Sequence, residues 1–181
     1  MIIIFGPAGS GKSMQGQMLA ARNGWRWLSA GQLLRDTRDP ELIAAMQTGR
    51  LVEHNRVNKI MSEAISRATN VRQVILDGFP RALEQAKWLL ENEAQHNDSI
   101  ELGVVLEVPK KELMKRLEVR GRVDDTLEAI DERLEIYRHE IEPILDYFAS
   151  QGVKIVRVDG TGSVGQVHDR IMEELVKCKL A

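Results

Sequence analysis

Short apolar runs alternate along the chain with longer segments in which apolar residues recur every three or four positions. Short runs rich in β-branched residues and bounded by Gly, Asp or Pro are typical of buried parallel strands, and the longer spacing is typical of amphipathic helices. The predicted strands cover residues 2–5, 25–29, 71–76, 102–108 and 153–158, of which 25–29 has the weakest pattern. The predicted helices cover residues 12–22, 30–36, 40–48, 55–69, 82–95, 109–120, 126–149 and 163–178.

The longest predicted helix, 126–149, carries a single apolar stripe that includes Leu127, Ile130 and Leu134. The alternation of strands and helices predicts a parallel sheet covered on both faces, because each crossover between parallel strands needs a long connection. We therefore expect the α/β class, with three layers (α/β/α) around a central five-stranded parallel sheet. A chain of 181 residues is expected to form one domain, residues 1–181.

The composition of the chain excludes several classes of protein. Hydrophobic residues make up 43% and charged residues 29%, which indicates a globular rather than a disordered chain. The formal net charge of −2 favours neither a nucleic acid nor an anionic membrane as a partner, so phosphate binding has to come from locally placed cations. The apolar run 2–5 is too short for a secretory signal or a membrane span, and the single cysteine, Cys178, has no internal disulfide partner. We expect a cytoplasmic protein with its four scattered histidines at the surface.

Residues 6–13 read Gly-Pro-Ala-Gly-Ser-Gly-Lys-Ser and match the complete phosphate-binding pattern G-x-x-x-x-G-K-[ST]. The pattern lies between a predicted strand and a predicted helix, which is the context that it requires. Glycines allow successive backbone N–H groups to point at phosphate oxygens, and the helix N-terminus adds a positive field. Lys12 can reach the β- and γ-phosphates of a nucleoside triphosphate, and the Ser13 hydroxyl can bind Mg²⁺. The sequence therefore predicts a P-loop.

A second candidate metal ligand is Asp77, which follows the apolar run 74–76. An acid at the carboxyl end of a strand beside a P-loop can hold Mg²⁺, usually through water. A P-loop by itself is compatible with a GTPase, an ATPase or a small-molecule kinase. A GTPase would read guanine with an Asn-Lys-x-Asp segment, but the only Asn-Lys pair, at 58–59, is followed by Ile60 and lies in a predicted helix. The residues that follow Asp77 distinguish between an ATPase and a small-molecule kinase.

Several segments, which follow one another from residue 1 to about 165, resemble the adenylate kinase and nucleoside-monophosphate kinase family. The most specific is Asp-Gly-Phe-Pro-Arg at 77–81, with Gln85 four positions later, which is similar to the family's monophosphate-binding signature. The other segments are 28–35, 49–52, 120–125 with Arg133, and 158–162. The resemblance implies a P-loop kinase domain with a small acceptor-binding flap at about 29–58 and a minimal lid at about 120–125.

The resemblance also implies roles for individual residues, which we give in three sets. The implied catalytic residues are Lys12, Arg81, Arg120, Arg122 and Arg133, and the implied ATP contacts are Gly9, Ser10, Gly11, Lys12, Ser13, Met14, Arg120 and Gly162. The implied contacts of the acceptor are Ser29, Ala30, Gly31, Arg35, Arg50, Leu51, Val52, Gly78, Phe79, Arg81, Gln85, Arg122 and Arg133. The implied ligands of Mg²⁺ are Ser13 and Asp77, partly through water. Arginine suits such a site, because its planar fork meets phosphate oxygens in pairs and offsets the repulsion between two polyanions.

The implied reaction is transfer of the terminal phosphate of ATP to a nucleoside monophosphate, with AMP as the favoured acceptor and Mg²⁺ as the cofactor, in a monomer. Two positions of the segment 28–35 depart from the family. Ala30 stands where the family usually has threonine, and Gln32 stands where it usually has an acid. Because the threonine helps to select adenine, a kinase of UMP, CMP or dAMP stays open as a second interpretation. A third interpretation is a nucleotide-binding regulatory protein with weak transfer activity. The presence of Lys or Arg at every expected phosphate-facing position argues against it.

The predicted lid and flap are both short. Only Gly121 separates Arg120 from Arg122, which leaves the lid little more than a turn and gives no room for a zinc-bearing insertion. We therefore expect closure to come from the flap and a few arginines, and we expect the active site to be wetter than usual.

Overall fold

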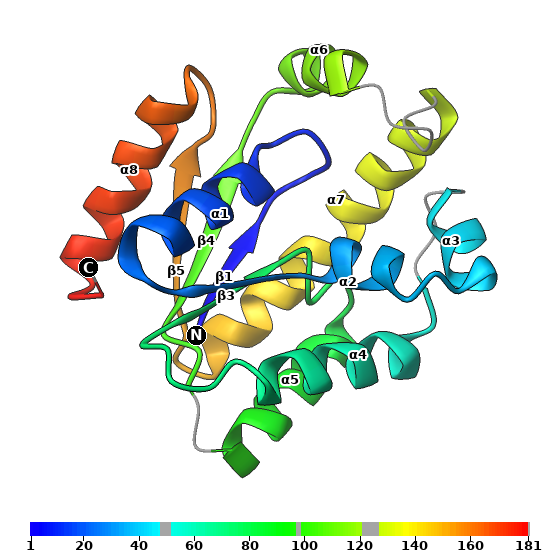
Figure 1. Ribbon diagram of the computed structural model, residues 1–181. Helices are drawn as coiled ribbons and strands as arrows, with labels where there is room; N and C mark the ends of the chain where they lie inside the picture. Colours follow the sequence, from blue (N-terminus) through cyan, green and yellow to red (C-terminus); the bar gives the residue numbers. More distant parts are fainter. Residues whose placement is uncertain (48–51, 97–98, 121–126, 181) are drawn as a thin grey trace.

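The computed structural model describes residues 1–47, 52–96, 99–120 and 127–180, and Figure 1 shows its layered arrangement. The described strands are β1 (Ile2–Phe5), β2 (Arg26–Ser29), β3 (Val74–Asp77), β4 (Leu102–Glu107) and β5 (Lys154–Asp159). The described helices are α1 (Lys12–Asn23), α2 (Ala30–Asp36), α3 (Pro40–Gln47), α4 (His54–Ser66), α5 (Leu83–His96), α6 (Lys110–Arg120), α7 (Leu127–Ser150) and α8 (Val164–Lys177). Every predicted strand and helix is present, with bounds shifted by up to three residues. The largest shifts are in the predicted strand 71–76, which begins at Val74 and extends to Asp77, and in the predicted helix 55–69, which ends at Ser66.

The five strands form one parallel sheet in the order β2-β3-β1-β4-β5, which confirms the predicted class. In the register of this sheet, Asp77 at the end of β3 lies beside Ile4 of β1 on one side and Ser29 of β2 on the other. Parallel strands end at the same edge, so this register brings Ser29, Asp77 and the loop that follows β1 together. The positions of the candidate site residues follow from this topology.

Two hydrophobic cores cover the two faces of the sheet. Along β1, Ile2 and Ile4 pack into the core that includes α1 and α8, whereas Ile3 and Phe5 pack into the core that includes α4, α5 and α7. All four side chains are at most 4% exposed, as a strand buried on both faces requires. Figure 1 shows the same division, with α1 and α8 on one side of the sheet and α5 and α7 on the other. The predicted three-layer architecture is therefore confirmed.

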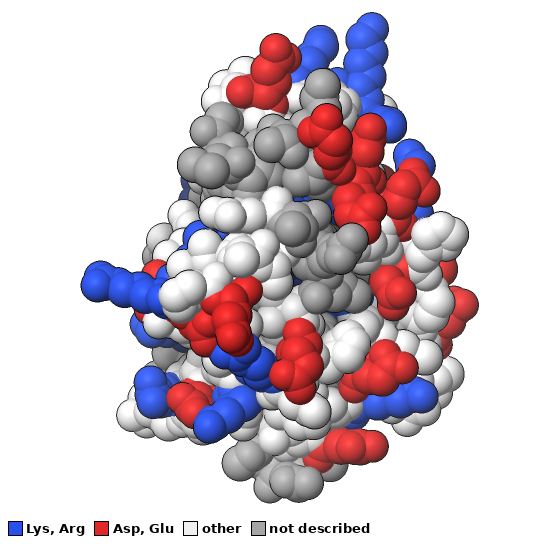
Figure 2. Space-filling model, turned by 90° about the vertical axis from the view of Figure 1, so that its right-hand side faces the viewer, with Lys and Arg blue, Asp and Glu red and all other residues white. Residues whose placement is uncertain are grey.

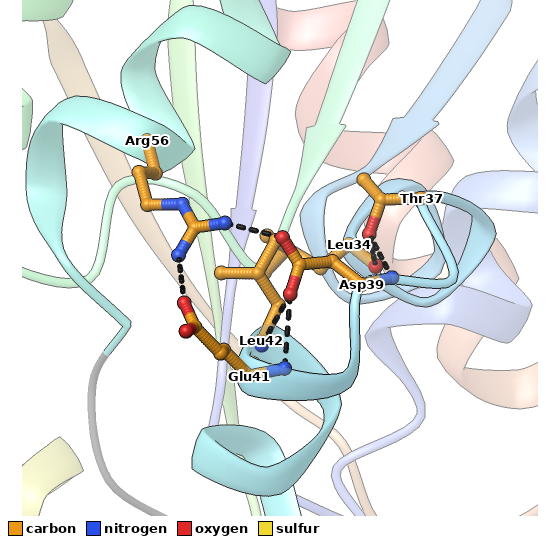
Figure 3. Close-up of polar contacts among 6 residues, drawn as sticks. All are labelled: Leu34, Thr37, Asp39, Glu41, Leu42 and Arg56. Atoms are coloured by element: carbon orange, nitrogen blue, oxygen red, sulfur yellow. Dashed lines mark hydrogen bonds and ion pairs between the residues drawn. The ribbon is translucent and has the colours of Figure 1, made fainter.

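The segment proposed as a flap, 29–58, contains α2, α3 and the start of α4, and polar contacts join the last two (Figure 3). Asp39 caps α3, because its Oδ1 accepts the N–H of Glu41 at 2.9 Å and that of Leu42 at 3.3 Å. Arg56 of α4 pairs with the carboxylates of both Asp39 and Glu41. Slight burial alone would raise the pKa of Asp39, but these two N–H groups and Arg56 lower it overall. The contacts hold α3 against α4 as one unit.

The predicted surface position of the histidines is wrong for His168 of α8, which is 1% exposed. The residue lies between Val167 and Ile171 on the buried stripe of a strongly amphipathic helix, where its imidazole packs against α1. His139 of α7 is exposed, as predicted.

The charged surface contains both signs. On the face that carries α3 and α7, acidic and basic side chains are interspersed over the described part, as Figure 2 shows. Within the described ranges, no helix is long and apolar enough to cross a bilayer.

Candidate active site

The P-loop connects the carboxyl end of β1 to α1. Gly11 caps the helix with a φ of 94°, in the left-handed region that glycine adopts without strain. At Gly6 a side chain would not fit, because a Cβ atom would lie 2.5 Å from the Oγ of Ser10. Lys12 lies back across the loop, and its Nζ donates to the carbonyl oxygen of Pro7 at 3.2 Å. The loop thus forms a cradle with an ammonium group at its mouth, as predicted from the sequence.

A cavity at the carboxyl edge of the sheet brings most of the implied phosphate-binding residues together. Its lining comes from the P-loop, α2, α3, the segment after β3, and one face of α7. Implied site residues in this lining are Lys12, Ser13, Ser29, Gly31, Arg35, Val52, Asp77, Gly78, Phe79, Arg81 and Arg133. Residues separated by more than one hundred positions in the sequence therefore face one space.

Three arginines from three different elements converge in this cavity. The position of a Cβ on Gly31 would be 3.6 Å from the guanidinium nitrogens of Arg35 and 4.0 Å from Nη2 of Arg81, so these two groups lie close together. Burial lowers the pKa of Arg81, Asp77 raises it, and the neighbouring charges of Arg133 and Arg35 lower it further. Arg81 is accessible to solvent, and it is one of the residues that line the cavity. A cluster of like charges in such a place favours an anionic ligand.

Two short contacts orient Arg81. Its Nε donates to the carbonyl oxygen of Gly78 at 2.8 Å, and its backbone N–H donates to Oε1 of Gln85 at 2.8 Å. Gly78 has a φ of 72°, and a Cβ there would lie 3.0 Å from Nη2 of Arg81, so glycine is required on both counts. Gln85 is only 2% exposed and bonds to the backbone of the turn. It is not among the described residues that line the cavity. Its contact with an acceptor base stays a prediction.

Asp77 and Ser13 have the chemistry that a magnesium site needs. Asp77 is 1% exposed, and its Oδ2 is buried without a hydrogen-bond partner among the described residues. A buried carboxylate oxygen of this kind calls for a cation or a water molecule. The Ser13 hydroxyl belongs to the same cavity. No cluster of three or more His, Cys, Asp or Glu side chains suited to a metal occurs in the described ranges, so the substrate phosphates would have to complete the ligand set.

Some implied ATP contacts, namely Gly9, Ser10, Met14 and Gly162, do not line the cavity in the described residues, whereas Lys12 and Ser13 do. Gly9 packs against α6, where a Cβ would lie 3.0 Å from Cγ of Leu117. Ser10 is 2% exposed, and its Oγ has no hydrogen-bond partner among the described residues. Met14 is 51% exposed on the first turn of α1, and Gly162 lies in the turn between β5 and α8 with a φ of 94°. The contacts of all four with ATP stay predictions.

The implied residues Arg50, Leu51 and Arg122 lie outside the described residues, as does the lid after Arg120. Arg120 ends α6, and its side chain is not among those described.

The two departures from the family are placed away from the described cavity wall. Ala30 is 3% exposed and packs into the core beside Leu34. Gln32 is exposed on α2, where its Nε2 donates to Oδ1 of Asp36 at 2.8 Å. Neither residue lines the cavity in the described part of the chain.

The cavity lining also contains side chains that were not predicted from the sequence as site residues. Met46 of α3, Tyr137 and Glu140 of α7 all face it together with Arg133. Burial raises the pKa of Tyr137, so its hydroxyl stays protonated in the physiological range. A signal was present for Tyr137 and Glu140, because they follow the predicted site residue Arg133 at helical spacing. Tyr137 was interpreted only as part of the apolar stripe.

Comparison with known proteins agrees with this site. The family model described as adenylate kinase matches residues 4–153. An adenylate kinase of Maricaulis maris is 39% identical over 92% of this chain and 93% of its own length. An adenylate kinase of Thermus thermophilus is 37% identical over 96% of each chain, and one of Mycolicibacterium paratuberculosis is 34% identical over 97% of this chain and 99% of its own. With this match over most of its length and with a P-loop facing an arginine cluster across one cavity, the chain belongs to the adenylate kinase family.

Proposed function

We propose that this adenylate kinase transfers the γ-phosphoryl group from ATP to AMP across the cavity, with the ATP phosphates on the P-loop and the AMP phosphate on Arg35 and Arg81. The observation that carries the proposal is the convergence of Arg35, Arg81 and Arg133 opposite Lys12. Like charges so close together raise one another's energy, and two phosphate groups placed among them offset this cost. Transition-state charge on the transferred group is stabilised by the same cations.

No protein side chain has to act as a nucleophile in this reaction. An oxygen of the AMP phosphate attacks the γ-phosphorus, the bond from that phosphorus to the β,γ-bridging oxygen breaks, and two molecules of ADP result. Lys12 contacts the donor phosphates, and Arg133 stabilises the group in transfer; Arg120 and Arg122 are proposed to assist it. Catalysis then comes from positioning and charge neutralisation.

Ser13 and Asp77 are proposed to hold Mg²⁺, with Asp77 acting through water. The orphaned Oδ2 of Asp77 supports this assignment. An ion held there would withdraw charge from the donor phosphates. The described side chains around this site bind and orient the nucleotides.

We propose residues 29–58 as the acceptor flap and 120–125 as the lid of a single kinase domain that acts as a monomer in the cytoplasm. Large apolar side chains that are exposed in the described ranges, Met14, Val119, Val164 and Val176, are scattered over several helices, which supports a monomer. The single Cys178 in the sequence suits a reducing compartment.

The test is to mix the protein with ADP and Mg²⁺ alone and to follow the appearance of ATP and AMP. Lys12→Met and Arg81→Ala are expected to reduce this exchange by about 100-fold or more, because each removes a charge that stabilises the transition state. Lys177→Met and Arg138→Ala are matched controls, since both side chains are exposed on helices away from the cavity. Wild-type exchange in both catalytic variants, or no exchange by the wild type, would overturn the proposal.

A panel of AMP, dAMP, UMP and CMP as acceptors distinguishes an adenylate kinase from the related alternatives. AMP is expected to give the highest kcat/KM.

A further inference from the structure

The turn between β5 and α8, residues 159–163, is held by an unusual number of hydrogen bonds. Oδ1 of Asp159 accepts the N–H of Thr161 at 2.9 Å, and the N–H of Gly160 donates to the carbonyl oxygen of Glu107 at 2.8 Å. Ser163 forms a capping box with Gln166 at the start of α8. Because most of its backbone is fixed from within, this turn has one conformation before any ligand arrives.

Arg170 fixes the turn from the next part of α8. Its Nη1 donates to the carbonyl oxygen of Asp159 at 2.8 Å and to that of Thr161 at 2.7 Å, and it lies 3.5 Å from Oδ2 of Asp159. One charged nitrogen thus bridges two carbonyl groups that flank Gly160. Charge-assisted hydrogen bonds of this kind are stronger than neutral ones. The bridge turns both carbonyls toward Arg170 of α8.

A second contact fixes the position of this turn relative to the P-loop. Nε2 of Gln15, three residues after Lys12, donates to the carbonyl oxygen of Val164 at 2.9 Å. Oε1 of Gln15 lies 3.3 Å from Nδ1 of His168, and both side chains are at most 2% exposed. The first turn of α8 is therefore joined to the first turn of α1. Any nucleotide that binds the P-loop through its phosphates has this turn at a set place beside it.

Two exposed apolar side chains lie on the helices that this contact joins. Met14 is 51% exposed next to Gln15 on α1, and Val164 is 48% exposed at the start of α8. Exposed apolar surface beside a turn of restrained backbone suits the flat apolar face of a heteroaromatic base. The donor site assigned under the proposed function has its phosphate end at Lys12.

We propose that Arg170 is a positioning residue for the donor nucleotide: by holding the carbonyls of Asp159 and Thr161, it presets the turn 159–163 to recognise the donor base. The inference rests on the proposed function, since it takes the P-loop as the donor phosphate site. Arg170 acts through the backbone of the turn and touches neither reacting phosphate. It therefore governs the affinity and the base selectivity for the donor, and it leaves acceptor binding and the chemical step unchanged.

The experiment compares three variants of Arg170 with the wild type, using saturating AMP and either ATP or GTP as the donor. In Arg170→Met both hydrogen bonds are lost, and we expect KM for ATP to rise about tenfold and the preference for ATP over GTP to fall by a similar factor. Arg170→Gln retains one donor for one carbonyl, and Arg170→Lys retains a charged nitrogen that can bridge both. The expected order of KM for ATP is therefore Lys, then Gln, then Met, with KM for AMP and kcat within about twofold of the wild type.

Lys177→Met is the matched control, because it removes an exposed, ion-paired cation from the same helix without touching the turn. If Arg170→Met does not fold, the Gln and Lys variants decide the question by themselves. Wild-type KM for ATP and wild-type donor preference in every variant that folds would overturn the inference. A parallel rise in KM for AMP, or a change that Lys177→Met reproduces, would also overturn it, because either result indicates general damage to the fold. Failure of the proposed function can be distinguished from failure of this inference, because the wild type itself would then not convert ADP to ATP and AMP.

Discussion

Nη2 of Arg133 on α7 donates a hydrogen bond of 3.0 Å to the carbonyl oxygen of Met46 on α3. The contact joins residues that are 87 positions apart and links the arginine proposed for phosphoryl transfer to the segment proposed as the flap. Both residues line the cavity. The proposed flap therefore contacts the arginine cluster, and an incoming phosphate is expected to compete with the Met46 carbonyl for the guanidinium of Arg133.

Arg133→Ala is expected to lower kcat for ADP exchange by about 100-fold, because it removes the cation proposed to stabilise the phosphoryl group in transfer. It should also release the flap, since α3 then loses the contact through Met46. Hydrogen exchange in peptides covering α3 measures the second effect, and it should be faster in the variant without nucleotide. Arg138→Ala, one turn further along α7 and exposed, is the control for loss of an arginine. Unchanged exchange in α3 would show that the carbonyl contact does not restrain the flap.

Substitutions at the two positions that depart from the family are expected to leave the acceptor preference unchanged. Gln32→Asp alters an exposed side chain whose partner is Asp36, so it should cost a few tenths of a kcal/mol through repulsion at i,i+4 spacing. Neither Gln32 nor Ala30 lines the cavity among the described residues. The ratio of kcat/KM for AMP to that for CMP checks the prediction. A tenfold change in this ratio for Gln32→Asp would mean that the side chain acts on the base.

The buried His168 should make the protein less stable in mild acid. Burial and the charge of Arg22 lower its pKa below the ordinary value of 6.5, against a smaller opposing effect of Asp169. As the pH falls below 6.5, the unfolded chain binds a proton at this residue while the folded chain does not, so the free energy of unfolding decreases. Above that pH the residue has no effect on the pH dependence.

Thermal unfolding at pH 7 and pH 5 measures this effect. His168→Gln, which keeps a polar group beside Gln15, should lose less Tm between the two pH values than the wild type does. His139→Gln, at an exposed position, should behave as the wild type. If the decrease in Tm is the same in all three proteins, other groups cause the acid sensitivity.

The short lid and flap expected from the sequence predict that water reaches the transferring phosphoryl group. ATP hydrolysis in the absence of AMP should then be a measurable fraction of the transfer rate, because water exclusion is what normally suppresses it. Lys12→Met should abolish both activities together, which separates this hydrolysis from a contaminating ATPase. Hydrolysis that is negligible beside transfer would mean that closure excludes water after all.

The sequence predicts the fold well because buried parallel strands and amphipathic helices leave clear local patterns. The weak strand 25–29 was confirmed, with its start at Arg26. Long-range polar contacts left no such pattern. The bond between Arg133 and Met46 and the contact between Gln15 and His168, 153 positions apart, depend on how distant helices dock.

The prediction for His168 failed for a more specific reason. A polar residue on the apolar stripe of a helix can be buried when a neighbouring element supplies a hydrogen-bond partner, and Gln15 does so here. The stripe formed by Val167, Ile171 and Leu175 already indicated the buried side of α8, so the face of the helix was a better guide than residue type. For the cavity, the resemblance to the family implied Arg35, Arg81 and Arg133, but only the packed structure revealed Met46.

The sheet is a partition between two independently packed halves. The helices on which the donor is proposed to rest, α1 and α8, share one core, and the elements around the acceptor, α2, α4 and α5, belong to the other. Substitutions in the core of α1 and α8 that alter the preferred phosphate donor can therefore leave the packing on the other face of the sheet in place. Redesign of the donor specificity would therefore begin in the α1–α8 layer.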